Sequence, residues 1–99
     1  MPNMDEILKM AQEAQAKLMQ AQEELAQATF EGTAGGDLVK ATVSGTGELQ
    51  GLDIKPEACD PEDTETLADL ILAAVRSATD QQQQAAAAKL GPMAGGLGL

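Results

Sequence analysis

The 99-residue sequence lacks most of the residue types on which enzymatic catalysis and large hydrophobic cores depend. It contains no His, Trp or Tyr, one Phe and one Cys. Without His, the commonest general base and a common zinc ligand are missing, and a single Cys excludes a disulfide within the chain. No nucleophile motif and no glycine-rich phosphate-binding motif is present. The sequence therefore indicates neither an enzyme nor a protein with a metal or another cofactor.

Bulky core residues are also scarce. Phe30 is the only aromatic residue, and much of the 43% hydrophobic content is Ala, which buries little area per residue. A chain of this length already buries a smaller share of its surface than a longer one. We therefore expect one domain that depends on a partner for stability, most simply a second copy of the chain.

Charge of one sign dominates the sequence. Six Lys and Arg residues stand against 16 Asp and Glu residues, which gives a net charge of −10. The N-terminus has neither the basic region nor the apolar region of a signal peptide, and no apolar run approaches the roughly 18 residues of a membrane span. These features predict a cytoplasmic protein.

The first helix is predicted over residues 3–29. Asn3 or Asp5 can cap its start, and apolar residues recur at steps of three and four. This seam is rich in Ala, whereas a two-stranded coiled coil needs larger residues, so a helix packed on its own domain or on a partner helix is favoured over a free-standing coiled coil. The seam consists of Met4, Ile7, Ala11, Ala14, Leu18, Ala21, Leu25 and Ala28.

From Thr29 the apolar period changes to two, which indicates strands. The run 29–33 reads as a short strand, and "AGGD" supplies glycines for a turn. In "LVKATVSG", Val39, Ala41 and Val43 lie on one face of a predicted strand. In "LQGLDIKP", Leu52 and Ile54 lie on one face of the next predicted strand. We expect a three-stranded antiparallel meander whose apolar face is covered by the helices.

The second helix is predicted to start with Asp60 as N-cap and Pro61 in the first position, and to stop at Gly91 and Pro92. The segment "QQQQAAAAK" is expected to project into solvent, because it lacks large apolar side chains. The carboxylates of residues 60–65 are explained by capping and by the helix dipole, with a divalent ion as the alternative. We divide the chain into one domain, residues 1–90, and a Gly-rich flexible tail, residues 91–99.

The predicted fold class is therefore α+β: a long N-terminal helix, a three-stranded antiparallel meander and a long C-terminal helix, assembled as a dimer. The candidates for core or dimer contacts are Leu18, Leu25, Phe30, Val39, Val43, Leu52, Ile54, Leu67, Leu70 and Ile71.

Three segments in this order resemble the YbaB/EbfC family of nucleoid-associated, DNA-binding proteins: "MAQEAQAKLMQAQEELAQ", "FEGTAGGDLVKATVSGTGELQGLDIKP" and "EDTETLADLILAAVRSA". The resemblance covers the chain up to about residue 90. It implies a homodimer with a central body of strands and projecting helices, shaped like tweezers. It also implies binding to duplex DNA and a place in the bacterial nucleoid, with a role in nucleoid organisation or gene regulation.

The net charge of −10 opposes such binding, because DNA is a dense line of negative charge. If the projecting helices hold DNA, the candidates for phosphate contacts are Lys9, Lys17, Arg76 and Lys89, and binding should weaken with added salt. Each of these side chains could instead be solvated or paired with a nearby carboxylate. The alternative function is an acidic dimeric module or scaffold that binds a protein partner without direct DNA binding, with Met10 and Met19 as an adaptable surface.

Overall fold

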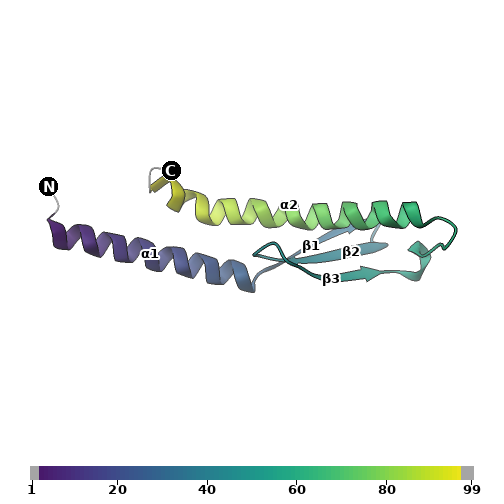
Figure 1. Cartoon of the computed structure of the whole chain (residues 1–99), viewed down its shortest axis with the longest axis horizontal. Helices are drawn as coiled ribbons and strands as arrows, with labels where there is room; N and C mark the ends of the chain where they lie inside the picture. The colour runs from purple at the N-terminus through teal and green to yellow at the C-terminus, as the bar shows by residue number, and fades with distance from the viewer. Residues whose placement is uncertain (1–2, 97–99) are drawn as a thin grey trace.

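The computed structural model describes residues 3–96, without the side chains of residue 90 and residues 92–96. The elements in chain order are α1 (Met4–Gln27), β1 (Thr29–Ala34), β2 (Val39–Ser44), β3 (Leu49–Ile54), the short 3-10 helix η1 (Pro56–Ala58) and α2 (Thr64–Gly96). The three strands form an antiparallel sheet in the order β1-β2-β3 (Figure 1). This arrangement confirms the predicted α+β class and the meander between two long helices.

The turn between β1 and β2 has the left-handed backbone that its glycines allow. Gly35, Gly36 and Asp37 have φ values of 66°, 64° and 73°. Glycine adopts this region without a steric penalty, whereas Asp does so at some cost. The predicted turn is therefore present, and its third residue has a backbone conformation that glycine would adopt more easily.

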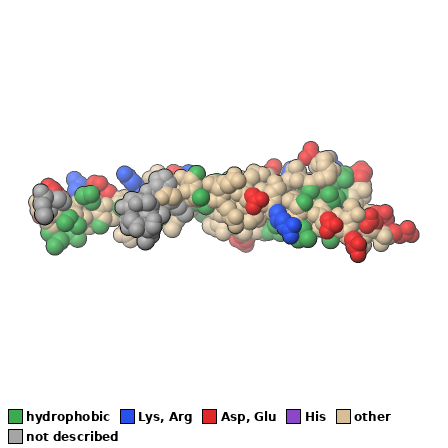
Figure 2. Space-filling model, turned by 90° about the horizontal axis from the view of Figure 1, so that it is seen from above, with side chains coloured by type: hydrophobic (Ala, Val, Ile, Leu, Met, Phe, Trp, Pro, Cys, Tyr) green, Lys and Arg blue, Asp and Glu red, His purple; other side chains and the backbone are tan. Residues whose placement is uncertain are grey.

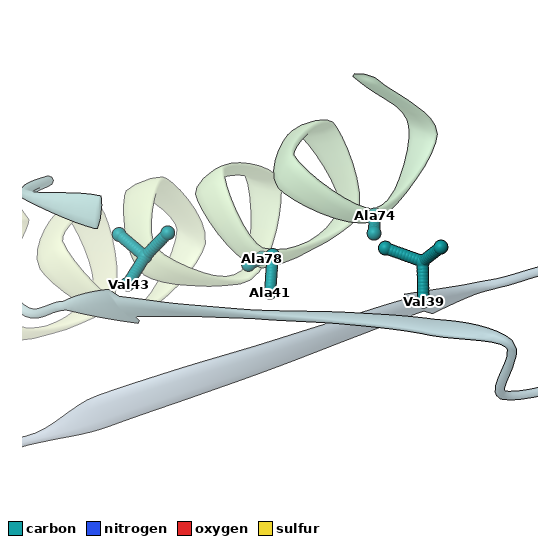
Figure 3. Close-up of a cluster of buried hydrophobic side chains, with 5 residues drawn as sticks. All are labelled: Val39, Ala41, Val43, Ala74 and Ala78. Atoms are coloured by element: carbon teal, nitrogen blue, oxygen red, sulfur yellow. The ribbon is translucent and has the colours of Figure 1, made fainter. Parts of the chain in front are cut away.

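The core lies between β2 and α2 and is built from small residues. Val39, Ala41 and Val43 point from β2 toward Ala74 and Ala78 of α2 (Figure 3). All five side chains are buried. Alternation along β2 places Lys40 and Thr42 on the opposite face of the sheet, as the period of two predicts. The short Ala side chains let the helix lie close to the sheet.

Of the two α-helices that the structure describes, α2 alone covers this face of the sheet, which corrects the expectation that both helices do so. α2 contacts β1 and β2, while β3 lies beyond it (Figure 1). Leu52 is opposite Ala41 in the strand register and so shares the apolar face, yet 41% of its surface is exposed. Of the other core candidates, Leu25, Val39 and Val43 are buried, and the half-buried ones are Leu18, Phe30, Ile54, Leu67, Leu70 and Ile71.

α1 leaves the sheet and projects away from it (Figure 1). Every described side chain from residue 3 to residue 17 is exposed, and of the seam only Ala21 and Leu25 are buried. The molecule measures 70 × 21 × 16 Å with a radius of gyration of 19.6 Å. A compact domain of this length would have a radius of gyration of about 13 Å. The chain is therefore a small body with a long helical arm.

The structure corrects both ends of the second helix. α2 begins at Thr64, and Asp63 rather than Asp60 accepts hydrogen bonds from Thr66, at 3.3 Å from its backbone nitrogen and 2.7 Å from its hydroxyl. Asp60 instead closes a turn, because its side chain accepts a hydrogen bond from the backbone N–H of Glu62 at 2.9 Å. Because of that turn, the observed N-cap comes three residues after the expected one.

At its other end α2 continues past Gly91 and Pro92 to Gly96. The φ angle of proline suits a helix, so Pro92 removes one backbone hydrogen bond without ending α2. Residues 97–99 of the predicted tail lie outside the described residues, and the division of the chain at residue 90 stays a prediction.

Polar side chains attach the middle of α2 to the body. The Gln81 amide nitrogen donates to the carbonyl oxygen of Glu31 at 2.9 Å, and that of Gln82 donates to the carbonyl oxygen of Gly45 at 2.8 Å. Ala85 and Ala86 are half-buried. The expectation that "QQQQAAAAK" projects freely into solvent was therefore wrong for the first half of this segment. The amide side chains are long enough to donate hydrogen bonds to backbone carbonyl oxygens of the body.

Candidate nucleic-acid interface

Lys9 and Lys17 lie on the exposed side of α1. The helix begins where Asn3 caps it, through a hydrogen bond of 2.9 Å from the backbone N–H of Glu6 to the Asn3 side-chain oxygen. Eight residues separate the two lysines, which places them roughly 12 Å apart along the helix axis. Glu13 lies between them at four-residue spacing from each, so the lysines belong to a mixed charged face rather than to a purely basic one.

Arg76 and Lys89 lie on α2 in different surroundings. Arg76 is exposed two residues after the buried Ala74, and so points away from the sheet. Lys89 forms an ion pair with Glu24 of α1, and each side chain is a little under half exposed. The hydrogen bond from Lys89 and its positive charge lower the pKa of the Glu24 carboxyl below its usual value. The ammonium group of Lys89 is therefore already engaged within the chain.

These four basic residues do not form one patch. Thirteen residues of helix separate Arg76 from Lys89, which is roughly 20 Å, and Lys9 lies farther out along α1. From the side of α2, isolated Lys and Arg side chains alternate with Asp and Glu (Figure 2). The acidic side chains gather at the end of the molecule that carries the turn before α2, and they are Glu57, Asp60, Glu62, Asp63 and Glu65. Within residues 3–96, no group of three or more potential ligands is placed to hold a metal ion.

Two further lysines lie outside the set that the sequence predicts. Lys40 is half-buried in β2 on the face of the sheet away from α2, with Thr33 and Asp53 as its neighbours in the register. Lys55 is exposed just after β3. Alternation in β2 predicts that outer face for Lys40. The pairing with Asp53 could not be read from the sequence, because it depends on the register of β3.

An uncovered apolar surface borders α2 on its β3 side. Leu49 and Leu52 of β3 are 49% and 41% exposed. We call these two residues the β3 surface. Leu49 and Leu52 lie opposite Val43 and Ala41 in the register, so they continue the face that α2 covers over β2. β3 is also an edge strand, with backbone groups free to pair on its outer side.

Fold and surface together define a small acidic α+β protein with helices that extend beyond the sheet and with an uncovered sheet edge (Figure 1). No helix within the described residues is both long and apolar enough to cross a membrane. The model of the YbaB/EbfC DNA-binding family matches residues 1–97. The chain belongs to this family, which is described by DNA binding and not by catalysis.

Proteins named nucleoid-associated proteins align with nearly the whole chain. That of Streptomyces avermitilis is 59% identical over 97 residues, covering 98% of this chain and 86% of the relative. That of Rhodococcus erythropolis is 56% identical, covering 98% and 87%. The solved structure of the uncharacterized protein HP0035 from Helicobacter pylori superposes with a TM-score of 0.73 at 18% identity, covering 85% of this chain and 88% of that one. This last similarity shows the fold alone.

Proposed function

We propose that this chain is a nucleoid-associated protein that binds duplex DNA as a homodimer, largely through contacts to the phosphate backbone. The observation that carries the proposal is the match to a DNA-binding family over residues 1–97, together with relatives named nucleoid-associated proteins. Its place would be the nucleoid of the bacterial cytoplasm, with a role in nucleoid organisation or gene regulation. The proposed partners are a second copy of the chain and DNA.

The β3 surface supports the homodimer. Leu49 and Leu52 leave apolar surface exposed on an edge strand, beside the face that α2 covers. The chain has few bulky residues elsewhere in its core, where Val39 and Val43 are the largest fully buried side chains. A second copy related by a twofold axis would cover Leu49 and Leu52 with the same residues of its own. Each copy would then contribute one α1 arm to the assembly.

The arms supply the proposed phosphate contacts. Lys9 and Lys17 of α1 and Arg76 of α2 are exposed, and a dimer doubles their number. Few side chains on these faces suit the readout of base edges, so contacts to phosphates and the shape of the duplex would provide most of the affinity. Because the chain carries a net charge of −10 and few basic residues, binding should be weak and should fall with added salt.

Fluorescence anisotropy with a labelled duplex, measured over a series of salt concentrations, tests DNA binding. We expect binding at low salt, and a dependence on salt that becomes shallower in the variant with Lys9→Gln and Lys17→Gln. The slope of log affinity against log salt should fall by about one for each lysine–phosphate interaction that the substitutions remove. Lys55→Gln, which removes one positive charge at the end of the sheet, is the control for each single substitution, Lys9→Gln and Lys17→Gln. Absence of binding at micromolar dimer in low salt would refute the function.

Sedimentation velocity tests the dimer separately. Leu49→Glu places a charge in the β3 surface, and we expect it to shift the chain from dimer to monomer. Leu8→Glu introduces the same charge at a leucine of similar exposure, 53%, on α1 and should leave the dimer intact. A dimer that survives Leu49→Glu would show that the copies meet elsewhere.

A second candidate function, binding of a protein partner without direct DNA contact, is favoured by the apolar side chains along α1. The exposed residues are Met4, Ile7, Leu8, Met10 and Met19, with exposures from 49% to 69%. Flexible Met side chains adapt to different partner surfaces. If the DNA experiment shows no binding, a pull-down from nuclease-treated lysate that depends on Ile7 and Leu8 would support this function instead.

A further inference from the structure

The base of α1 touches the turn after β2 at Gly45, with no room for a side chain. A Cβ atom at Gly45 would lie 1.6 Å from the carbonyl oxygen of Leu25 and 2.3 Å from its carbonyl carbon. The backbone N–H of Gly45 donates to the carbonyl oxygen of Ala28 at 3.0 Å. Among the glycines of the two turns, Gly35, Gly36 and Gly47 have positive φ and Gly45 does not, so space and not backbone conformation requires glycine here.

Gly45 also connects α1 to α2. Its carbonyl oxygen accepts the hydrogen bond from Gln82, so both helices are attached to the same residue. Ser44, just before it, is buried, and its hydroxyl accepts a hydrogen bond from the backbone N–H of Glu48 at 3.1 Å. The turn that carries Gly45 is therefore braced by its own hydrogen bonds and offers α1 a rigid point of attachment.

One helical turn farther along α1, the ion pair between Glu24 and Lys89 makes a second link to α2. Glu24 also accepts a hydrogen bond from Gln20 at 3.4 Å. On the opposite flank of α1 the two helices are separated by an open, mostly apolar cleft of about 620 Å³, which the side chains of Met19, Gln22, Ala26, Gln82 and Ala86 help to line. Close packing therefore does not fix the tilt of α1 on that flank. The ion pair of Glu24 with Lys89 is then a main restraint on this tilt.

A small change at this base has a large effect at the far end of α1. Twenty-four residues separate Ala28 from Met4, a length of roughly 36 Å at 1.5 Å per residue. A tilt of about 10° at Gly45 would move the tip by roughly 6 Å. Such a displacement exceeds the length of a hydrogen bond, and it would take Lys9 out of reach of a phosphate that it contacts.

We propose that Gly45 and the pair Glu24–Lys89 are positioning residues that set the direction of the α1 arm, and that Lys89 serves as a brace rather than as a phosphate contact. The part of this inference that concerns DNA rests on the proposed function. Gly45 is the pivot, because any larger residue pushes the last turn of α1 off the sheet. Glu24–Lys89 limits the tilt about that pivot.

The direction of the arm can be measured without DNA. In a Cys59→Ser background, spin labels are attached at Gln12→Cys on α1 and at Thr33→Cys on β1. Pulsed electron paramagnetic resonance then measures the distance between the two labels, and so from the arm to the body. The doubly labelled chain is diluted into an excess of unlabelled chain, so that the distance is intramolecular in a monomer and in a dimer alike. We expect Gly45→Ala and Glu24→Gln each to shift or broaden the distance distribution by about 3 Å or more.

Gly51→Ala is the matched control, because a Cβ at Gly51 would meet only Thr42, at 3.9 Å. It should leave the distribution unchanged. If Gly45→Ala fails to fold, Glu24→Gln still tests the brace, because it alters an exposed side chain. An unchanged distribution in Glu24→Gln overturns the brace, and an unchanged distribution in a folded Gly45→Ala overturns the pivot.

DNA affinity then distinguishes whether Lys89 contacts a phosphate or holds α1 in place. Glu24→Gln removes one negative charge and frees Lys89, so a phosphate-contacting Lys89 predicts tighter binding. The brace predicts binding weaker by about three-fold or more, because the arms lose their direction. Tighter binding would overturn the assignment of Lys89. If the distances change as expected but neither the wild type nor any variant binds DNA, the proposed function is refuted. The assignment of Gly45 and Glu24–Lys89 as positioning residues is then still supported.

Discussion

Gly32 of β1 faces the backbone of α2 so closely that a Cβ atom at this position would lie 2.3 Å from the carbonyl oxygen of Ala74. The same atom would lie 2.4 Å from the backbone nitrogen of Ala78. Backbone atoms of a helix cannot yield as a flexible side chain can. Gly32, Ala74 and Ala78 therefore let α2 approach the sheet closely, and the small residues in this sequence set the spacing of its two layers.

We expect Gly32→Ala to destabilise the chain by about 2 kcal/mol, within the range of overpacked cores. The added methyl group must push α2 away from β1 and loosen the packing around Val39 and Ala41. Urea unfolding followed by circular dichroism measures the change. Gly51→Ala provides the control, since its methyl group has room and a strand interior favours Ala over Gly slightly. Equal stability of both variants would contradict the close approach.

Asp37 is the one described residue other than glycine with a positive φ, at 73°. Replacing it with glycine relieves the steric cost of the left-handed backbone, although it also makes the unfolded chain more flexible. We expect Asp37→Gly to stabilise the chain by about 0.5–1 kcal/mol. Urea unfolding checks this value, and Asp37→Ala should destabilise instead, because Ala tolerates positive φ less well than Asp.

Asp63 caps α2, so its removal should cost stability. We expect Asp63→Ala to lower the free energy of unfolding by about 1 kcal/mol, through loss of the hydrogen bonds to Thr66. Glu62→Ala, at an exposed neighbouring position, should change it by less than about 0.5 kcal/mol. Thermal unfolding of both variants makes the comparison, and the reverse order of stability would argue for a different N-cap.

The ion pair between Glu24 and Lys89 should give a small stabilisation that depends on pH. Because folding lowers the pKa of Glu24, the pair stabilises the folded chain above the pH at which the unfolded carboxyl titrates. This contribution is lost as the pH falls through the lowered pKa. We expect the stability difference between wild type and Glu24→Gln to be largest near neutral pH and to disappear in acid, in urea unfolding at a series of pH values.

Both partners of this pair are partly exposed, so salt should reduce the same difference. Glu23→Gln is the control, because the described part of the structure shows no ion pair for Glu23. A difference between wild type and Glu24→Gln that stays constant from neutral to acidic pH would mean that the pair does not stabilise the fold.

Local patterns in the sequence predicted the elements well. The alternation around Val39 and Val43 identified β2 and its buried face, and one of the two predicted caps, Asn3, begins α1. These features depend on neighbouring residues and on the periods of the helix and the strand. The N-cap of α2 was predicted three residues too early, because Asp60 and Asp63 are both residues that cap helices well. In the structure Asp60 accepts a hydrogen bond within the turn, and Asp63 caps α2.

The sequence by itself determined the order of elements, the acidic charge, and the absence of the side chains on which most catalysis relies. Tertiary structure alone decided that α2 covers two strands and leaves Leu52 exposed, that Lys89 is paired with Glu24, and that Gly45 supports the base of α1. Such contacts join residues that are far apart in the chain. The close approach of two backbones depends on how whole helices and strands pack, and local sequence patterns do not encode this packing.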